Sequence, residues 1–228
     1  MTNVPSTCPR CDKPTALCVC DKVELVDTRL RIVMLQHPQE DDAILGTAKL
    51  VTLTLPKAEI RVGLSWASLD HALGVQNANR ERWAVLAATK LKVELPPQAK
   101  GQPVVLVDRN GRVRDLARHG LDGVIVLDGT WSQAKTLWWR NAWLLKLPRI
   151  VLTPREPSMY GRLRKEPRRD YVSTLEAIAD VLPALGEDEH ARDSLRRLLR
   201  TLLQRARDVK RAEPKKRSQP RPRASKAT

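Results

Sequence analysis

The stretch "GVIVLDGTW" at residues 123–131 joins a short apolar run to a polar turn. An apolar run of this length without alternation is typical of a strand that a parallel sheet covers on both faces. Asp128 stands where this strand should end, and parallel sheets bind ligands outside the carboxyl ends of their strands. Gly129 permits tight backbone geometry, and Thr130 is suited to cap a helix that begins near Trp131. Asp128 is therefore either a functional carboxylate or, with Thr130, a simple cap beside a packed Trp131.

Five more runs have the length and composition of strands, and helix-like segments at 41–55 and 132–145 lie between them. Most of these runs are continuously apolar, so the sequence predicts an α/β fold with a mostly parallel sheet. A chain of 228 residues is long enough for one substantial core, which we place in residues 23–207. The five runs are 29–35, 59–63, 83–88, 103–107 and 149–153.

Residues 192–207 form the clearest predicted helix, with an apolar stripe of leucines at helical spacing. Three arginines fall off the stripe and should point outward. The leucine face can be covered within one chain, which favours a monomer over a dimer. Residues 208–228 lack core-forming side chains, and we expect them to form a disordered basic tail. The leucines are Leu195, Leu198, Leu199, Leu202 and Leu203, and the arginines are Arg196, Arg197 and Arg200.

The chain is strongly basic, with 41 Lys and Arg against 26 Asp and Glu, a formal charge of +15. Residues 210–228 carry eight Lys or Arg against Glu213 alone, so about half of this charge lies on the remaining body of the chain. A basic body and tail favour a polyanionic partner such as nucleic acid over a mere solubility charge. No apolar stretch approaches the roughly 20 residues that cross a bilayer, and no apolar leader is evident. We expect a cytoplasmic protein without a membrane partner.

All four cysteines lie within residues 1–22, at the spacing C-x2-C-x6-C-x-C. In a reducing compartment this arrangement favours a small zinc knuckle over disulfides, with free or redox-active thiols as the alternative. Four protein sulfurs leave no open position on the metal, so a zinc ion here should be structural. The predicted ligands are Cys8, Cys11, Cys18 and Cys20.

Two further segments follow predicted strands. His37 and Glu40, in "QHPQE", could either meet a ligand or form a turn. Residues 154–182 begin as an Arg- and Pro-rich loop and continue into a helix, for which Ser173 and Glu176 predict a capping box. The loop is either a solvated excursion or a segment that wraps a ligand and approaches phosphates. Its arginines are Arg155, Arg162, Arg164, Arg168 and Arg169.

The tryptophans at 131, 138, 139 and 143 are dense, and core packing explains most of them better than base stacking. Only Trp131, beside the strand end, is a functional candidate. Walker A, Gly-rich dinucleotide, HExxH and G-x-S-x-G motifs are absent from the sequence, which argues against the corresponding enzyme classes.

Taken in order, "CPRC…CVC", "HPQE" with "LGTAKL", "LDGTW" and "YVSTLEAIA" resemble the DTW-domain family of tRNA-uridine aminocarboxypropyltransferases, over residues 8 to 182. The D-x-T-W motif of that family is complete at residues 128–131. The resemblance implies a SPOUT-like fold with a C-terminal trefoil knot that holds S-adenosylmethionine. It also implies transfer of the donor's 3-amino-3-carboxypropyl group to N3 of a tRNA uridine, with release of methylthioadenosine.

The resemblance further assigns roles to residues. Asp128 would be a base or an orienting group, and Trp131 would hold the adenosine or the base by stacking. Where many members have Asn, this chain has Gly46, so a side-chain contact there is lost. The implied donor-binding residues are Thr47, Leu127, Thr130, Trp131, Tyr171, Ser173 and Thr174. From their charge, the five loop arginines are expected to approach phosphates, and the zinc knuckle and the basic tail, with Lys215, Lys216 and Arg217, are expected to hold tRNA.

Two rival functions stay open at this point. A SPOUT-type RNA methyltransferase would use the same donor but release S-adenosylhomocysteine. A non-catalytic zinc-knuckle RNA-binding protein would not bind S-adenosylmethionine at all.

Overall fold

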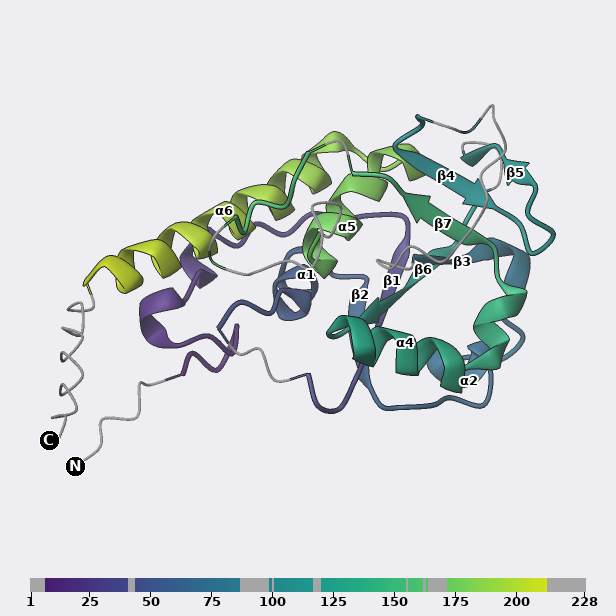
Figure 1. Cartoon of the computed structure of the whole chain (residues 1–228), viewed down its shortest axis with the longest axis horizontal. Helices are drawn as coiled ribbons and strands as arrows, with labels where there is room; N and C mark the ends of the chain where they lie inside the picture. Colours follow the sequence, from purple (N-terminus) through teal and green to yellow (C-terminus); the bar gives the residue numbers. More distant parts are fainter. Residues whose placement is uncertain are drawn as a thin grey trace, which may run out of the picture.

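The computed structural model describes residues 7–40, 44–86, 99, 101–116, 120–154, 156–161, 163 and 172–212. Within them, seven strands form a single sheet in the order β2-β1-β6-β3-β7-β4-β5 (Figure 1). The first five strands of that order run parallel, whereas β4 is antiparallel to both β7 and β5. The predicted α/β fold with a mostly parallel sheet is confirmed. The strands are β1 (Arg31–Gln36), β2 (Ala58–Val62), β3 (Trp83–Leu86), β4 (Val104–Val107), β5 (Val113–Arg114), β6 (Gly123–Asp128) and β7 (Arg149–Leu152).

In the described ranges, five α-helices connect or cover these strands: α1 (Ala48–Thr54), α2 (Leu69–Leu73), α4 (Trp131–Arg140), α5 (Thr174–Val181) and α6 (Glu189–Ala212). Short 3-10 turns are η1 (Thr15–Leu17), η2 (Cys20–Lys22), η3 (Arg80–Arg82), η5 (Ala142–Lys146) and η6 (Pro183–Leu185). Helix α6 extends beyond the predicted 192–207 at both ends. None of the helices in the described ranges is both long enough and apolar enough to cross a membrane.

The helical segment predicted over 132–145 is interrupted at Asn141. Its side-chain amide is fully buried and donates to the carbonyls of Leu137 and Leu64, at 2.8 and 3.1 Å. The backbone of Asn141 leaves the helical region, so α4 ends at Arg140 and η5 follows as a separate turn. Asx side chains often compete with the helical backbone in this way.

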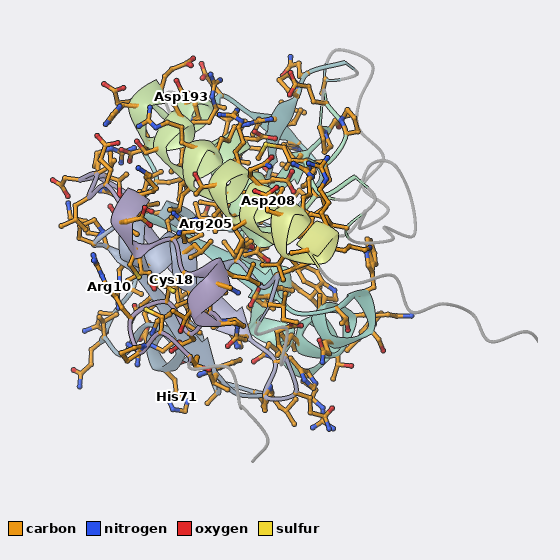
Figure 2. The ribbon with its side chains drawn as sticks, turned by 90° about the vertical axis from the view of Figure 1, so that its left-hand side faces the viewer. Arg10, Cys18, His71, Asp193, Arg205 and Asp208 are labelled. Carbon is orange, nitrogen blue, oxygen red and sulfur yellow. The ribbon has the colours of Figure 1, made fainter. Side chains whose placement is uncertain are left out.

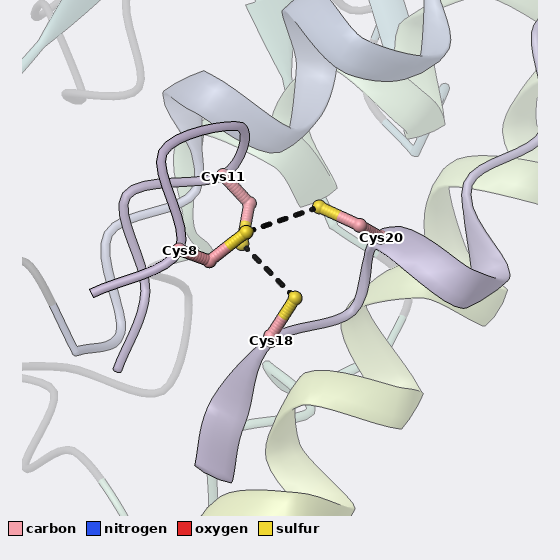
Figure 3. Close-up of side chains that lie close together, drawn as sticks. All are labelled: Cys8, Cys11, Cys18 and Cys20. Atoms are coloured by element: carbon pink, nitrogen blue, oxygen red, sulfur yellow. Dashed lines mark hydrogen bonds between the residues drawn. The ribbon is translucent and has the colours of Figure 1, made fainter. Parts of the chain in front are cut away.

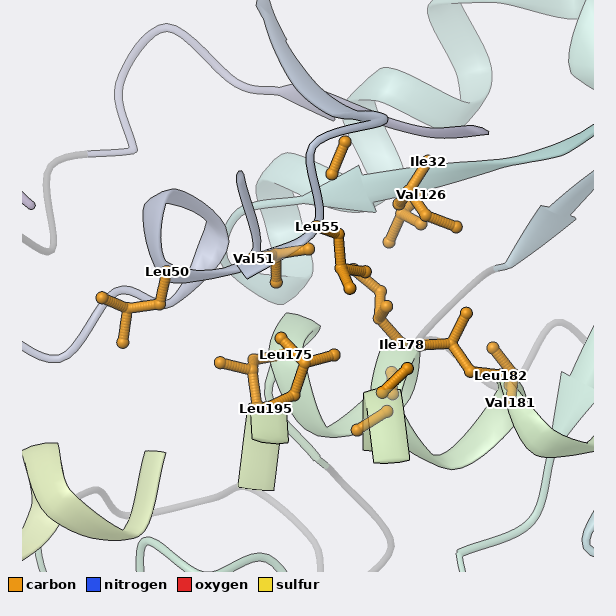
Figure 4. Close-up of a cluster of buried hydrophobic side chains, with 14 of the residues drawn as sticks. Ile32, Leu50, Val51, Leu55, Val126, Leu175, Ile178, Val181, Leu182 and Leu195 are labelled. Carbon is orange, nitrogen blue, oxygen red and sulfur yellow. The ribbon is translucent and has the colours of Figure 1, made fainter. Parts of the chain in front are cut away.

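Two hydrophobic layers cover the two faces of the sheet. On one face, α1 and α5 pack on alternate strand residues such as Ile32 and Val126, and α6 packs on α1 and α5 (Figure 4). On the other face, α2 and α4 pack on the intervening residues, among them Val33 and Ile125. Strand β6 is buried along its whole length, because both layers cover it. The leucine stripe of α6 is buried in the first layer, as predicted from its spacing.

Neighbouring strands β1 and β6 send their connections to opposite faces. The chain leaves β1 toward α1 in the first layer, and it leaves β6 toward α4 in the second. The two strands end side by side, with Gln36 paired in register with Asp128. In α/β proteins, the crevice at such a switch point, outside the carboxyl edge of the sheet, is where ligands bind.

The buried leucine stripe generates a stability prediction. Leu199→Ala should lower the free energy of unfolding by about 2–5 kcal/mol, because Leu199 is fully buried and truncation leaves a cavity. The measurement is urea denaturation. Gln204→Ala on the exposed side of α6 is the control and should change stability by no more than about 0.5 kcal/mol. Equal effects of the two substitutions would contradict the packing of α6 on α1 and α5.

Candidate functional site

Asp128 lies at this switch point with both carboxylate oxygens engaged. Gln36 at the end of β1 donates from Nε2 to Oδ2 at 2.7 Å, and the hydroxyl of Thr174 donates to Oδ1 at 2.5 Å. Only 6% of Asp128 is exposed. Its carboxylate therefore joins β6, β1 and α5, although each oxygen retains a second lone pair for a further donor. Helices α4 and α5 both begin near Asp128, and the positive ends of their dipoles favour a negative group there.

The first residues of α5 also contact the turn that precedes α1. The backbone N–H of Leu175 donates to the hydroxyl of Thr47 at 3.3 Å, and Thr47 is 5% exposed. Leu127, another implied donor contact, is buried in β6 beside Asp128. The structure thus brings Thr47, Leu127, Asp128 and Thr174 together at one edge of the sheet, from three separate parts of the sequence.

The turn from β6 into α4 is tightly built. Thr130 caps α4 in a capping box with Gln133, which confirms the predicted N-cap. Gly129 has a φ of 141°, and a Cβ there would lie 3.0 Å from the Gln133 side chain, so both conformation and space require glycine. Gln133 also donates to the carbonyl of Gln39 at 3.0 Å and ties this turn to the segment after β1.

Among the remaining predicted residues of this region, Trp131 is half-buried at the start of α4. His37 is 8% exposed, and its Nδ1 accepts from the backbone N–H of Gln39 at 3.1 Å, as a turn residue does. Trp138 and Trp143 are core residues as predicted, whereas Trp139 is 69% exposed. Tyr171, the five loop arginines and Lys215, Lys216 and Arg217 lie outside the described residues.

The buried carboxylate of Glu176, which the sequence presented only as half of a capping box, organises the loop that precedes α5. Glu176 is 3% exposed and accepts from the backbone N–H and the hydroxyl of Ser173, which confirms the predicted box. It also accepts from the hydroxyl of Ser158 at 2.9 Å and the backbone N–H of Met159 at 2.7 Å. Glu176 thereby fixes both a midpoint and the end of the segment from β7 to α5.

Two buried side chains hold the turn before Thr47. The hydroxyl of Tyr160, a fully buried residue, donates to the carbonyl of Leu45 at 2.6 Å. The ammonium of Lys13, which is 3% exposed, donates to the carbonyl of Gly46 at 2.5 Å. Lys13 belongs to the cysteine-bearing segment, so that segment directly supports the backbone beside the candidate site. A lysine two residues after a cysteine gave no sequence signal for this role.

The four cysteines gather as predicted, with all Sγ atoms within 4.8 Å of one another (Figure 3). The pairs Cys8–Cys20 and Cys11–Cys18 both have Sγ–Sγ distances of 3.7 Å. A tetrahedral Zn²⁺ with Zn–S bonds of about 2.3 Å requires Sγ–Sγ edges of about 3.8 Å. The donor set therefore fits a metal ion of that size and geometry.

The electrostatics of the cluster also favour a cation. The backbone N–H groups of Cys11 and Arg10 lower the pKa of the Cys8 thiol to about 6. Burial and the neighbouring thiols raise the pKa of Cys20. The pKa of Cys18 is also raised, because burial and thiol neighbours outweigh the lowering effect of the Cys20 N–H. Four thiolates this close repel one another, and a bound divalent cation removes that repulsion.

The cysteine segment docks on α6. Cys11, Leu17 and Val19 are buried in the same core cluster as the leucine stripe. Arg205 of α6 binds Asp21 at 2.9 Å, and Figure 2 shows Arg205 beside the segment that carries Cys18. These contacts hold the segment on α6 as part of one core cluster.

The model of the DTW domain matches residues 5–207. The chain belongs to the DTW-domain family. It is 26% identical to tRNA-uridine aminocarboxypropyltransferase 2 of Macaca fascicularis over 205 residues, which cover 86% of this chain and 61% of that protein. The protein of the same name from Drosophila melanogaster is 29% identical over 199 residues, 86% of this chain and 72% of its own. tRNA-uridine aminocarboxypropyltransferase A of Arabidopsis thaliana is 26% identical over 204 residues, 79% and 73% of the two chains.

The predicted family resemblance is therefore confirmed over most of this DTW-domain chain. The chain spans 61% of the length of the two mammalian relatives. No solved structure matches it significantly.

The role of Glu176 in this DTW-domain chain can be tested by Glu176→Gln. An amide turns a donor toward Ser158, Met159 or Ser173, so we expect a loss of about 2–4 kcal/mol in the free energy of unfolding. Hydrogen exchange should quicken at Met159 and Ser173. Glu189→Gln, in the exposed first turn of α6, is the matched control. Unchanged exchange at Met159 would exclude the proposed anchoring of the loop.

The contact of Lys13 with the turn before Thr47 predicts a difference in stability between two lysine variants. Lys13→Met leaves the Gly46 carbonyl without its ammonium donor, and stability should fall by about 1–3 kcal/mol in urea denaturation. Lys49 pairs with Asp12 at 3.5 Å on the surface, so Lys49→Met should cost less than about 1 kcal/mol. If both variants are equally stable, the Lys13 contact does not hold the turn.

Proposed function

We propose that this chain transfers the 3-amino-3-carboxypropyl group of S-adenosylmethionine to N3 of a uridine in tRNA. In this reaction N3 loses its proton and bonds to the donor's Cγ, the Cγ–S bond breaks, and methylthioadenosine leaves. The names of the relatives support the aminocarboxypropyl group over a methyl group. The observation that carries the proposal is the Asp128 carboxylate, held at the switch-point crevice between Gln36 and Thr174.

Asp128 is suited to orient and to stabilise charge. A carboxylate with a donor on each oxygen and 6% exposure is fixed in direction, so it can align a donor cation or a uridine N3–H with little reorganisation. Its remaining lone pairs still allow it to accept the N3 proton. Trp131, half-buried at the start of α4, would stack on the adenosine or on the acceptor base.

The donor would lie between the β6 end and the start of α5. We assign donor contacts to Thr47, Leu127, Thr130, Ser173 and Thr174, which lie at this edge of the sheet, and to Tyr171 by its place in the motif. The segment from 154 to 173 would form the SPOUT-like knot around the donor. Its attachment through Glu176 and Tyr160 supports that role, because a segment anchored at several points can enclose a ligand without losing register.

We propose that basic residues of the chain hold the RNA through its phosphates. The loop arginines at 155, 162, 164, 168 and 169 and the tail residues Lys215, Lys216 and Arg217 supply charge for phosphates. We further propose that Cys8, Cys11, Cys18 and Cys20 bind a structural Zn²⁺. Zinc bound there would secure the segment on which Lys13 lies, with no part in the transfer itself.

The decisive experiment is incubation of the protein with S-adenosylmethionine and an unmodified tRNA transcript, followed by mass analysis of the nucleosides. We expect a uridine heavier by one aminocarboxypropyl group, together with methylthioadenosine. A methylated base with S-adenosylhomocysteine would identify a methyltransferase. Tight RNA binding without affinity for S-adenosylmethionine would identify a non-catalytic RNA-binding protein.

Asp128→Asn tests the central residue. The amide preserves size but removes the charge and opposes one of the two donors, so transfer should fall by at least about 100-fold. Donor binding, measured by calorimetry, should remain detectable. Asp122→Asn, one position before the opposite end of β6, is the control and should keep full activity. Near-normal turnover of Asp128→Asn would rule out a catalytic role for the carboxylate.

The metal site makes its own prediction. Elemental analysis should find about one zinc per chain, and Cys20→Ser should reduce that content, because it removes one of four ligands. Zinc affinity should weaken as the pH falls, since protons compete for the sulfurs, and most strongly for Cys18 and Cys20, whose pKa values are raised. Thr15→Ser, in the same segment, should keep full zinc content. Zinc-free native protein would overturn the assignment.

A further inference from the structure

A groove of about 630 Å³ lies between α6 and the carboxyl end of β7, at some distance from the cysteines. Leu152, Thr153 and Pro154 line one side of it. The other side carries four arginines of α6, namely Arg192, Arg196, Arg197 and Arg200. Positions 192, 196 and 200 are four residues apart, so these side chains follow one another along one face of the helix.

The arginines of the groove are partly fixed by carboxylates. Arg196 binds Asp180 at 2.6 Å and Glu156 at 3.0 Å, and it is itself largely covered. Burial raises the pKa of Asp180, against the opposing effect of Arg196. A guanidinium held in this way has spare donors and little rotamer entropy left to lose when it binds a planar oxyanion.

Arg200 differs from its neighbours. It is exposed, and within the described ranges no carboxylate pairs with it. Arg192 pairs with Glu189 and with Asp193, which also lines the groove, and Arg197 pairs with Glu24. Arg200 is therefore the groove cation with the least compensation, and the helix that carries it holds eight Lys or Arg against three acidic residues.

The groove lies along the same edge of the sheet as Asp128. Strand β7 runs parallel to β6, with β3 between them, so their carboxyl ends are about two strand spacings, or roughly 10 Å, apart. The segment that starts at Pro154 in the groove returns to Ser173 beside Asp128. One nucleic-acid chain can therefore reach both places.

We propose that this arginine groove binds the phosphate backbone of the same RNA whose uridine enters the Asp128 site. The inference rests on the proposed function for its choice of polyanion. It adds a contact surface on α6 to the loop and tail residues. In this arrangement, phosphates held by Arg200 and its neighbours fix the position of the RNA, while the residues of the Asp128 site act on the uridine base.

The test compares charge reversal in the groove with charge reversal elsewhere. Affinity for an unmodified tRNA transcript is measured by fluorescence anisotropy between low and moderate salt. Arg200→Glu should weaken binding by about tenfold and reduce the salt slope by about 1, because at least one phosphate contact is lost. Arg200→Lys keeps the charge and should restore most of the affinity and the slope.

Arg140→Glu is the matched control. It makes the same charge change in the last turn of α4, on the opposite face of the sheet, and should leave the slope nearly unchanged. Equal losses of tRNA affinity in Arg140→Glu and Arg200→Glu would show that the effect comes from net charge alone. That result would overturn the proposal that the groove binds RNA. Unchanged affinity in Arg200→Glu would overturn it as well. Failure of the proposed function is a separate result, since it would leave tRNA bound by the unaltered protein without any aminocarboxypropyl product.

Discussion

The buried carboxylate of Asp128, which accepts one hydrogen bond on each oxygen, determines how β6, β1 and α5 meet at the edge of the sheet. Asp128 could not be covered to 6% exposure without partners, because an unpaired buried charge is strongly unfavourable. Gln36 and Thr174 supply those partners from β1 and α5. Once α5 is placed by this pair, its next residues reach Thr47 and its Glu176 reaches the loop after β7. The local order of the edge follows from that one group.

Sequence reasoning was most accurate where the determining signal is local. Continuous apolar runs predicted the strands of the described sheet except β5. The N-cap at Thr130 and the capping box of Ser173 with Glu176 also followed from local spacing. The clustering of the cysteines followed from the chemistry of thiolates in close sequence. In each case the deciding residues lie within one turn or one short segment.

The features that the sequence did not predict depend on contacts between residues that are far apart in the chain. The pairing of Gln36 with Asp128 requires the register of two strands 92 residues apart. Lys13 finds the Gly46 carbonyl only after the cysteine segment has docked. The antiparallel direction of β4 and the break at Asn141 likewise follow from tertiary partners, which no local pattern specifies. The family resemblance pointed to the residues around Asp128, but only the structure identified the long-range contacts that support them.

Helix α6 carries a consequence for how the chain is made. The cysteine segment buries Cys11, Leu17 and Val19 against leucines that lie nearly 180 residues later, and Arg205 closes the contact with Asp21. A ribosome therefore extrudes the first part of this core long before its docking surface exists. Until α6 is synthesised, these early apolar residues remain unpacked. In the cell they are then accessible to chaperones, to proteases and to metal-binding molecules.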